Sequence, residues 1–356
     1  MKIVNLALFA AAMGVALAAA NGQARAECSA DNWQDCEGKP WVIGKIETPI
    51  GERWWPNKLW GAGDEAGATN WYTKPEVVKR ALAEADKGKV YNLGRPYDAA
   101  MPTFGGRKFE LTMPSVGSGG PAGANAIVYM DEIITGELGQ VGTQFDGLGH
   151  ISVSTKGAGD ASDVRYYNGF TAAETFTPAG LKKVGVEKLH PIVARGVLLN
   201  VAAARGVDML DAGYVITVAD VTAALEKQGM AGFEFKPGDG VFFYTGWSKL
   251  WMADNEKFNS GEPGIGMEVA KWISDDVQAG VVGADTWGTE AVPGEDPNCV
   301  FCAVHTHLIT RNGIVNQENM NLDGLIQDGV YTFTYMYTPM PIVGATGSPG
   351  APIAID

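Results

Sequence analysis

Positively charged residues are scarce in this chain of 356 residues. Only 27 Lys and Arg stand against 41 Asp and Glu, which gives a formal net charge of −14. An acidic surface argues against binding to nucleic acid or to anionic membranes, so we expect neither as a partner. Long apolar runs are also scarce. The one at residues 6–20 is short and rich in alanine, which argues against a membrane span.

That apolar run has the features of a secretory signal peptide. Lys2 forms a short basic region ahead of it, and Ala24-Arg25-Ala26 after it is an A-x-A cleavage site. We therefore expect residues 1–26 to be removed, so that Glu27 becomes the N-terminus. The mature protein should be soluble and periplasmic.

Linkers and repeats are absent from the rest of the sequence. No Pro/Ser-rich stretch, block of like charge or internal repeat divides residues 27–356. The chain is 46% hydrophobic, with 10 Trp, 11 Tyr and 13 Phe, which is ample for a large core. We therefore expect residues 27–356 to form a single domain.

Cysteine is rare too, and the four cysteines occur as two close pairs. Cys28 lies near Cys36, and Cys299 and Cys302 form a CxxC motif. In an oxidising compartment such pairs favour disulfides, 28–36 and 299–302, although cross-pairing stays open.

A zinc site is the alternative for the second pair. Cys299-x-x-Cys302-x-x-His305-x-His307 contains four residues of zinc-ligand type. The spacing differs from that of the usual zinc fingers, and export disfavours free thiolates.

Local patterns predict helices that alternate with strands. Helix signals begin at Thr73-Lys-Pro75-Glu76, read as a capping box with proline at the first helical position and a helix to Gly88, at Thr217 with an end near Gly229, and at Met267 with an end at Asp276. Runs of β-branched and aromatic residues predict strands at 126–130, 196–201, 240–244, 280–284 and 330–337. This interleaving indicates a layered α/β fold.

The most informative segment is Gln140-Val-Gly-Thr-Gln144-Phe-Asp146-Gly-Leu-Gly-His150. In a strand, side chains alternate between faces, so Gln140, Gln144 and Asp146 would point together. The glycines that follow would end the strand and bring His150 in from a turn. A carboxylate and an imidazole beside two amides could hold a divalent cation with a base next to it. The alternative is a glycine-rich turn whose polar groups satisfy the backbone.

The same segment resembles the signature of the cyclase family, the kynurenine formamidase-like or isatin hydrolase-like metal-dependent hydrolases. That signature is H-x-G-T-H-x-D-x-x-x-H. Other stretches resemble the longer-chain branch of the family: Trp60-Gly-Ala-Gly-Asp-Glu-Ala-Gly, Arg195-Gly-Val-Leu-Leu, Gly238-Asp-Gly-Val, Thr245-Gly-Trp247, Gly283-Ala-Asp285-Thr-Trp287 and Gly344-Ala-Thr-Gly-Ser-Pro349. The resemblance implies a swivelling β/β/α fold with a mixed sheet and flanking helices. It also implies a divalent metal site, and oligomers whose subunits help build each other's sites. We therefore expect a homodimer or homotetramer.

The resemblance also assigns metal ligands, at Asp146, His305 and Glu318. Two histidines of the family signature are replaced here by Gln140 and Gln144. Glutamine coordinates only through its neutral carbonyl oxygen, which is a weaker ligand than imidazole. We therefore expect one ion, Mn²⁺ or Zn²⁺, rather than two, with Gln144 as a candidate fourth ligand and Gln140 beside it.

Further candidates come from other parts of the chain. His307 lies two residues after His305, so in a strand it would share a face with it and reach the same pocket. Asp285 and Trp287 follow a predicted strand, at an end where α/β folds often place sites, although core packing accounts for Trp287 equally well. Four tryptophans could wall a site or pack between subunits, and packing is favoured: Trp54, Trp55, Trp60 and Trp71.

These residues predict a periplasmic, metal-dependent hydrolase of a small amide, lactam or lactone. The resemblance gives His150 the role of the base that takes a proton from water and returns it to the leaving group. One alternative is a lyase or dehydratase, in which His150 removes a C–H proton. Another is a catalytically silent protein that binds a small molecule.

Overall fold

A computed structural model of the chain describes residues 54–115, 117–156, 160–295 and 303–356. The expected signal peptide and all four cysteines lie outside these ranges, so cleavage and disulfide pairing stay predictions. Within the ranges described, no helix is both long enough and apolar enough to cross a membrane.

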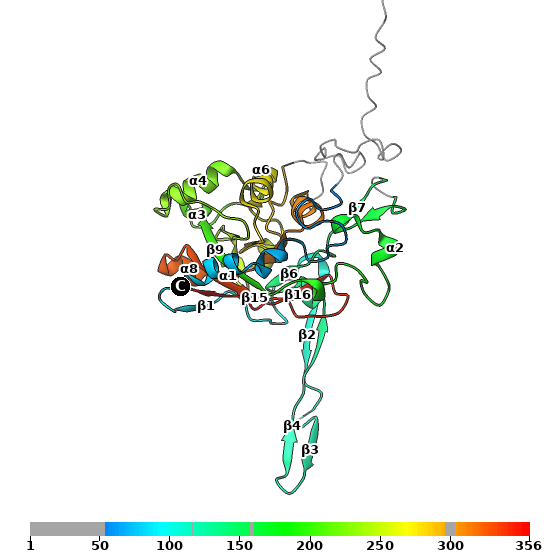
Figure 1. The fold of residues 1–356 in the computed structure, drawn as a ribbon. Helices are drawn as coiled ribbons and strands as arrows, with labels where there is room; N and C mark the ends of the chain where they lie inside the picture. Colours follow the sequence, from blue (N-terminus) through cyan, green and yellow to red (C-terminus); the bar gives the residue numbers. More distant parts are fainter. Residues whose placement is uncertain (1–53, 116, 157–159, 296–302) are drawn as a thin grey trace, which may run out of the picture.

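A mixed sheet forms the centre of the molecule, with its described strands in the order β1-β17-β15-β9-β11-β13-β14-β6-β16 (Figure 1). Four neighbours run parallel: β9 (Ile192–Asn200), β11 (Gly240–Tyr244), β13 (Val281–Ala284) and β14 (Val315–Glu318). Every residue of β11, β13 and β14 is buried. Burial of this kind is typical of parallel strands that are covered on both faces.

Antiparallel strands extend the sheet on both sides. One side carries β15 (Thr332–Tyr337), β17 (Ile353–Ile355) and β1 (Val90–Asn92), and the other carries β6 (Gln144–Asp146) and β16 (Gly347–Pro349). Phe242 of β11 packs against Phe333 and Tyr335 of β15, with ring centroids 5.7 Å and 4.7 Å apart. The apolar core therefore spans the join between the parallel and antiparallel parts.

Helices flank the sheet, as the α/β prediction requires. They are α1 (Pro75–Leu82), α2 (Ala172–Thr175), α3 (Val201–Ala204), α4 (Val218–Lys227), α5 (Asn255–Asn259), α6 (Met267–Lys271), α7 (Ala303–His305) and α8 (Asp323–Asp328). Helix α1 packs on β9 and β15, while α3, α4 and α6 lie in the upper part of Figure 1. The fold class expected from the sequence, a mixed sheet with flanking helices, is confirmed.

Both helix starts predicted from capping are confirmed, including Pro75 as the first residue of α1, but the capping box expected at Thr73 is absent. Thr217 caps α4, because its hydroxyl accepts from Asp220 N while the Asp220 carboxylate accepts from Thr217 N. Thr73 does not cap α1. It ends the preceding 3-10 helix, and its hydroxyl donates to Asn70 O at 2.8 Å. Helix α1 also ends at Leu82 instead of continuing to residue 88.

Short and irregular segments complete the described chain. The 3-10 helices are η2 (Gly67–Thr73), η3 (Phe104–Gly106), η4 (Leu138–Gln140), η5 (Tyr167–Gly169), η6 (Val186–Lys188) and η7 (Trp247–Leu250). Two-residue strands are β7 (Val153–Ser154), β8 (Val164–Arg165), β10 (Val215–Ile216) and β12 (Gly264–Ile265). Two segments have π-helical geometry: η8 (Trp272–Val277) and η9 (Thr306–Arg311). The helix expected over 267–276 is thus divided into α6 and η8.

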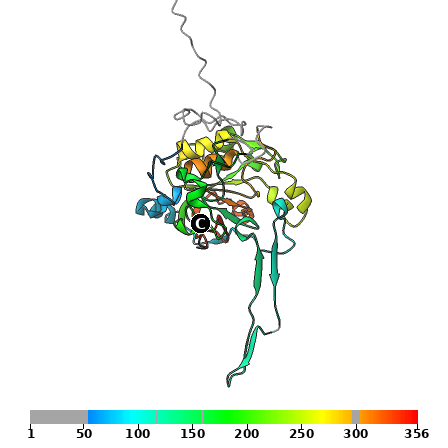
Figure 2. The same ribbon diagram turned by 90° about the vertical axis from the view of Figure 1, so that its right-hand side faces the viewer.

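A long hairpin projects from the body (Figures 1 and 2). We call residues 109–136 the arm. It consists of β2 (Phe109–Thr112) paired with β5 (Ile133–Gly136) and, farther out, β3 (Gly119–Ala122) paired with β4 (Ile127–Tyr129). The strand predicted at 126–130 exists as β4, but it lies at the exposed end of the arm and not in the core. The apolar sequence of this segment therefore predicted the strand correctly but not its exposed position.

Candidate metal centre

Strands β6 and β14 build the floor of the site. They pair antiparallel, with Asp146 opposite Asn316 and Gln144 opposite Glu318. Because side chains alternate along a strand, the two residues that β6 contributes share one face, and so do the two from β14. All four side chains are buried. The expected grouping of Gln144 with Asp146 is therefore a direct result of strand geometry.

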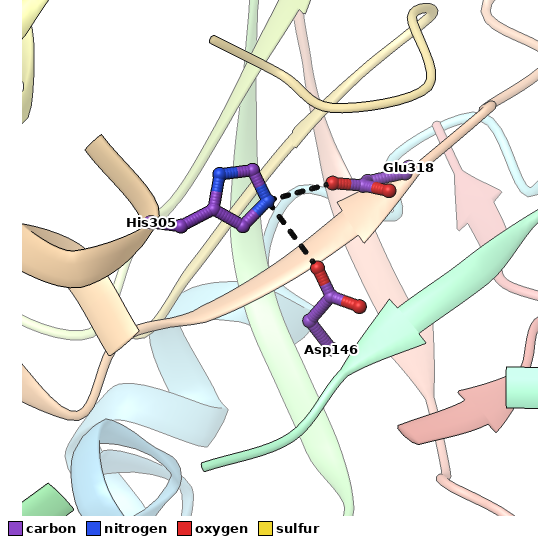
Figure 3. Close-up of side chains that lie close together, drawn as sticks. All are labelled: Asp146, His305 and Glu318. Carbon is purple, nitrogen blue, oxygen red and sulfur yellow. Dashed lines mark hydrogen bonds and ion pairs between the residues drawn. The ribbon is translucent and has the colours of Figure 1, made fainter. Parts of the chain in front are cut away.

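His305 approaches this floor from the end of α7, as Figure 3 shows. Its Nε2 atom lies 3.1 Å from Glu318 Oε1 and 3.6 Å from Asp146 Oδ2. Ligand atoms of the three residues all lie within 4.8 Å of one another. Atoms bonded to one ion at about 2.0–2.3 Å must be about 3–4.5 Å apart, so this cluster needs only small adjustments to hold a single cation.

Buried acceptors without donors provide a second test of this fit. Among the described residues, Asp146 Oδ2, Gln140 Oε1 and Gln144 Oε1 are buried and accept no hydrogen bond. Leaving such an atom unsatisfied costs about 1–3 kcal/mol. Asp146 belongs to the cluster of ligand atoms, so a cation at its centre would satisfy Asp146 Oδ2, and the residues present fit a divalent ion.

The amides of the two glutamines lie against the carboxylates. Gln140, which comes from η4 and not from a strand, donates from Nε2 to Asp146 Oδ1 at 3.0 Å. Gln144 Nε2 donates to Glu318 Oε2. The structure thus brings both glutamines to the cluster, as the sequence predicted, although Gln140 reaches it by a different backbone route.

Electrostatics make the centre a strong attractor of cations. Burial and the nearby charge of Asp146 raise the pKa of Glu318 to about 7. Burial by itself lowers the pKa of His305, but the carboxylate of Glu290 and those of the cluster raise it well above its usual range. Both shifts are the response of buried groups to closely spaced carboxylates, whose mutual repulsion a divalent ion would also relieve.

Two carboxylates of this region were missed by the sequence analysis. Glu290 Oε1 lies 2.6 Å from His305 Nδ1, and its other oxygen accepts from Val304 N at 2.9 Å. Glu262 accepts from Trp287 N at 2.6 Å, while its Oε1 is buried and accepts no hydrogen bond from the described residues. Burial raises the pKa of Glu262 well above its usual range. Neither residue stands in a pattern that separates it from a surface glutamate.

His150 stands beside the cluster, in the turn after β6. Its Nε2 atom is 3.8 Å from Asp146 Oδ1. Burial lowers the pKa of His150, although the charge of Asp146 opposes this effect. The imidazole is therefore neutral near pH 7 and able to accept a proton.

The pocket around His150 is small. It encloses about 30 Å³, which is space for about one water molecule, and its lining includes Phe104 and Arg107 from the segment just before the arm. Trp287 also lines it, stacked on Phe104 with ring centroids 3.8 Å apart. The indole N–H of Trp287 donates to Phe258 O at 3.0 Å, so the residue serves both the pocket and the core.

Asp285 lies outside this pocket. Its carboxylate accepts from Thr245 N and Oγ1 and from Gly246 N, at 2.7–2.9 Å. It does not line the pocket that holds His150, and its hydrogen bonds join the ends of β13 and β11.

His307 also lies elsewhere, because the expectation of a strand was wrong. His305 and His307 occupy consecutive helical turns, α7 and η9, in which residues two apart point in nearly opposite directions. His307 lines a different cavity and contacts Ser274. A zinc site that combines both histidines with the CxxC motif is therefore contradicted.

Comparison with known proteins identifies the family. The family model named Cyclase ("Putative cyclase") matches residues 91–291. A crystal structure of a novel cyclase is 30% identical to this chain, with a TM-score of 0.71, and the match covers 83% of this chain and 96% of that one. The chain belongs to the cyclase family.

More distant structures share the fold. Isatin hydrolase A from Labrenzia aggregata is 19% identical, with a TM-score of 0.52, over 78% of this chain and 98% of that chain. Isatin hydrolase A from Ralstonia solanacearum is 19% identical, with a TM-score of 0.51, over 79% and 98%. At this identity the likeness shows the fold alone. The search of curated proteins gave no significant match.

Proposed function

We propose that this protein is a metal-dependent hydrolase that cleaves a small amide, lactam or lactone. The observation that carries the proposal is the convergence of Asp146, His305 and Glu318 from three separate elements. The neutral His150 imidazole in the same pocket adds a base. The fold shared with isatin hydrolases is consistent with this class of reaction.

The cluster suits one Mn²⁺ or Zn²⁺, held by Asp146, His305 and Glu318 with Gln144 as a fourth ligand. When bound, such an ion supplies Lewis-acid polarisation of a carbonyl and lowers the pKa of water. A donor set of one imidazole nitrogen and carboxylate or amide oxygens suits either metal.

The protein supplies position and proton transfer. Glu290 holds the imidazole of His305 with Nε2 toward the cluster, because it binds the opposite ring nitrogen. His150 accepts a proton from the attacking water and returns it to the leaving nitrogen or oxygen, so that one water is added across the cleaved bond. Trp287 and Phe104, which stack on each other at the edge of this pocket, limit the access of bulk water to it.

The test is metal analysis of the purified mature protein together with a screen of small amides, lactams and lactones, with and without chelator. We expect about one Mn²⁺ or Zn²⁺ per chain and turnover that chelation abolishes. Hydrolysis in H₂¹⁸O should place one labelled oxygen in the acid product. Turnover without label would instead identify a lyase or dehydratase, and bound ligand without turnover a silent binding protein.

We also propose that the protein works in the periplasm as a homodimer or homotetramer held together through the arm. The arm exposes large apolar side chains on both its strand pairs: Leu111, Met113, Ile127, Val128, Tyr129, Met130, Ile133 and Ile134, each 45–55% exposed. A two-stranded ribbon alone in water is marginally stable. A second copy is the partner that every molecule of this protein meets, and exchange of arms between two copies covers both ribbons at once.

A further inference from the structure

The pocket of the metal centre has a buried end and a partly exposed end. Its buried lining residues are Gln144, Trp287, Gly288, Glu290, His305 and Glu318. Its partly exposed lining residues are Phe104, Arg107, Gln140, His150 and Val292, and we call these five the mouth of the pocket. A substrate whose carbonyl reaches the metal ligands extends outward through the mouth. The mouth therefore contacts the part of the substrate that does not react.

Arg107 is the only lysine or arginine that lines this pocket. Within the ranges that the structure describes, its guanidinium lies over the ring of Phe104, 6.0 Å from the centroid, and makes no hydrogen bond or ion pair. The two carboxylates that line the pocket, Glu290 and Glu318, each already contact His305 at the buried end. The planar fork of five N–H donors at the mouth is therefore available to a ligand.

The backbone on both sides of Arg107 has a defined conformation. Gly105 and Gly106, which precede it, have φ angles of 70° and 76°, a region that favours glycine. After it, Lys108 N donates to Glu137 Oε2 at 2.7 Å, and Lys108 O accepts from Glu137 N at 3.2 Å. The guanidinium therefore extends from a fixed main chain, which lowers the entropy cost of binding a ligand.

The chemistry of the mouth favours an anion joined to a short carbon chain. Phe104 and Val292 offer apolar surface beside the cation of Arg107. The protein as a whole carries a formal charge of −14, so most of its surface repels anions, and an unpaired guanidinium attracts them to one place. Because Arg107 and His150 line the same small pocket, an anion on Arg107 lies within the length of a small molecule from the reacting carbonyl.

We propose that Arg107 selects substrates that carry a carboxylate, so that the substrates are small amides, lactams or lactones with a free acid group near the scissile carbonyl. This inference rests on the proposed function and adds the substrate class to it. The guanidinium binds the carboxylate through two parallel N–H···O bonds. Phe104 and Val292 contact the carbon atoms between the acid and the carbonyl. Hydrolysis adds one water and leaves a product with one more carboxyl group than the substrate.

Three matched pairs of compounds test this selection with the metal-loaded mature protein. They are 5-oxoproline and 2-pyrrolidinone, N-formylglycine and N-methylformamide, and γ-butyrolactone-γ-carboxylate and γ-butyrolactone. The members of a pair differ by one carboxylate. We expect kcat/KM to be at least about tenfold higher for the carboxylate, as for a charge-assisted contact. The amide of 5-oxoproline, which has the size but not the charge, should behave as 2-pyrrolidinone does. Added NaCl should reduce the preference.

Variants assign the preference to Arg107. Arg107→Met should lower the ratio of kcat/KM between carboxylate and neutral compound about tenfold. Arg107→Lys keeps the charge but not the fork, so it should retain part of the preference. Lys108→Met is the matched control, because Lys108 is the next residue, is exposed and does not line the pocket. Its ratio should equal that of the wild type. Arg107 is only partly buried, so its variants should fold.

The outcomes separate this inference from the proposed function. Turnover without preference for the carboxylates, or a preference unchanged in Arg107→Met, would overturn the role of Arg107 and leave the hydrolase intact. If none of the six compounds is turned over, calorimetric titration with the same compounds decides. Binding of the carboxylates alone, lost in Arg107→Met, would support selection by Arg107 and count against hydrolysis. Absence of carboxylate binding would overturn the selection.

Discussion

At the scale of single residues, the centre is defined by carboxylates that no side chain fully neutralises. Asp146 is completely buried, and burial opposes its charge, but His150, His305 and Gln140 hold its pKa below the usual range. Two carboxylates buried side by side, Asp146 and Glu318, repel each other, and a cation between them would remove that repulsion. The two histidines beside Asp146, His150 and His305, should differ in what they contribute.

Substitution separates metal binding from proton transfer. Asp146→Ala should lose both metal and activity, because it removes a ligand. His150→Ala should keep the fold and most of the metal, while turnover falls about 10²–10⁴-fold, the usual contribution of a general acid–base. Metal content by mass spectrometry and kcat are the measurements, with His190→Ala, a histidine outside both cavities, as control. Full turnover in His150→Ala would refute the mechanism, and loss of its metal would make His150 a ligand.

Glu290 is a positioning residue. Its bond to His305 Nδ1 fixes the ring, and removal of such a partner lowers metal affinity by about 10–100-fold. Glu290→Gln should weaken metal binding by that factor in a chelator competition, with little change in KM. The exposed Glu256→Gln on α5 is the matched control. An unchanged metal affinity would show that His305 needs no partner to hold its orientation.

The pH dependence of activity should follow His150. Its base form is the neutral imidazole, and burial lowers its pKa from 6.5, so the neutral form persists as the pH falls through 6.5. The acidic limb of kcat/KM should therefore have its midpoint below pH 6.5 and should vanish in His150→Ala. A midpoint above 6.5 would assign the limb to another group.

At the scale of elements, the arm is the feature whose exposed apolar residues are not covered by the body. It pairs only with itself among the described residues, and Leu111 and Ile134 lie directly opposite each other with both side chains exposed. The segment just before the arm carries Phe104 and Arg107, which line the pocket of His150. Burial of the arm by another copy would therefore also fix one wall of the pocket.

Charged substitutions on the arm should dissociate the protein. Ile127 and Tyr129 are two residues apart on β4 and therefore share a face, so Ile127→Lys with Tyr129→Lys places two charges on that face. We expect a wild-type dimer or tetramer and a monomeric variant by light scattering, with a melting temperature close to wild type. Val207→Lys, an exposed apolar position on the body, should leave the assembly intact. A wild-type monomer would refute the role of the arm.

At the scale of the whole molecule, export and fold are separate properties. The described residues between 54 and 356 include the mixed sheet, an apolar core and the candidate metal centre. The signal peptide expected at residues 1–26 is a prediction from the sequence alone. Export and cleavage can therefore be tested only by expressing the full chain in a cell.

Expression of the full chain in a Gram-negative bacterium tests the expected location. The protein should leave the cell on osmotic shock, and its intact mass should begin at Glu27. Ala24→Leu with Ala26→Leu removes the small residues that the cleavage site needs, so this variant should retain residues 1–26. Recovery of the unprocessed wild-type chain in the cytosol would contradict the prediction.

Sequence patterns of short range were sufficient for part of this protein. The cap of α4 depends on residues three apart, and the strands β11 and β13 depend on runs of four or five apolar residues. Gln144 and Asp146 share a face because they are two apart on one strand. Short-range patterns gave wrong predictions at two positions. The Thr73 hydroxyl donates to Asn70 O within η2 and does not cap α1. His307 lies in the π-helical segment η9 and not in a strand.

The family resemblance, and not residue spacing, predicted that His305 and Glu318 lie beside Asp146. Residues more than a hundred positions apart in the sequence form no local pattern. Only the tertiary structure selected Glu290. Of the two candidates after β13, Trp287 lines the pocket of His150, whereas the carboxylate of Asp285 accepts from the backbone N–H groups of Thr245 and Gly246. Only the tertiary structure showed the arm and the cavity that His307 lines. Apolar and aromatic residues form the same sequence patterns whether they fill a core, contact a partner or line a cavity.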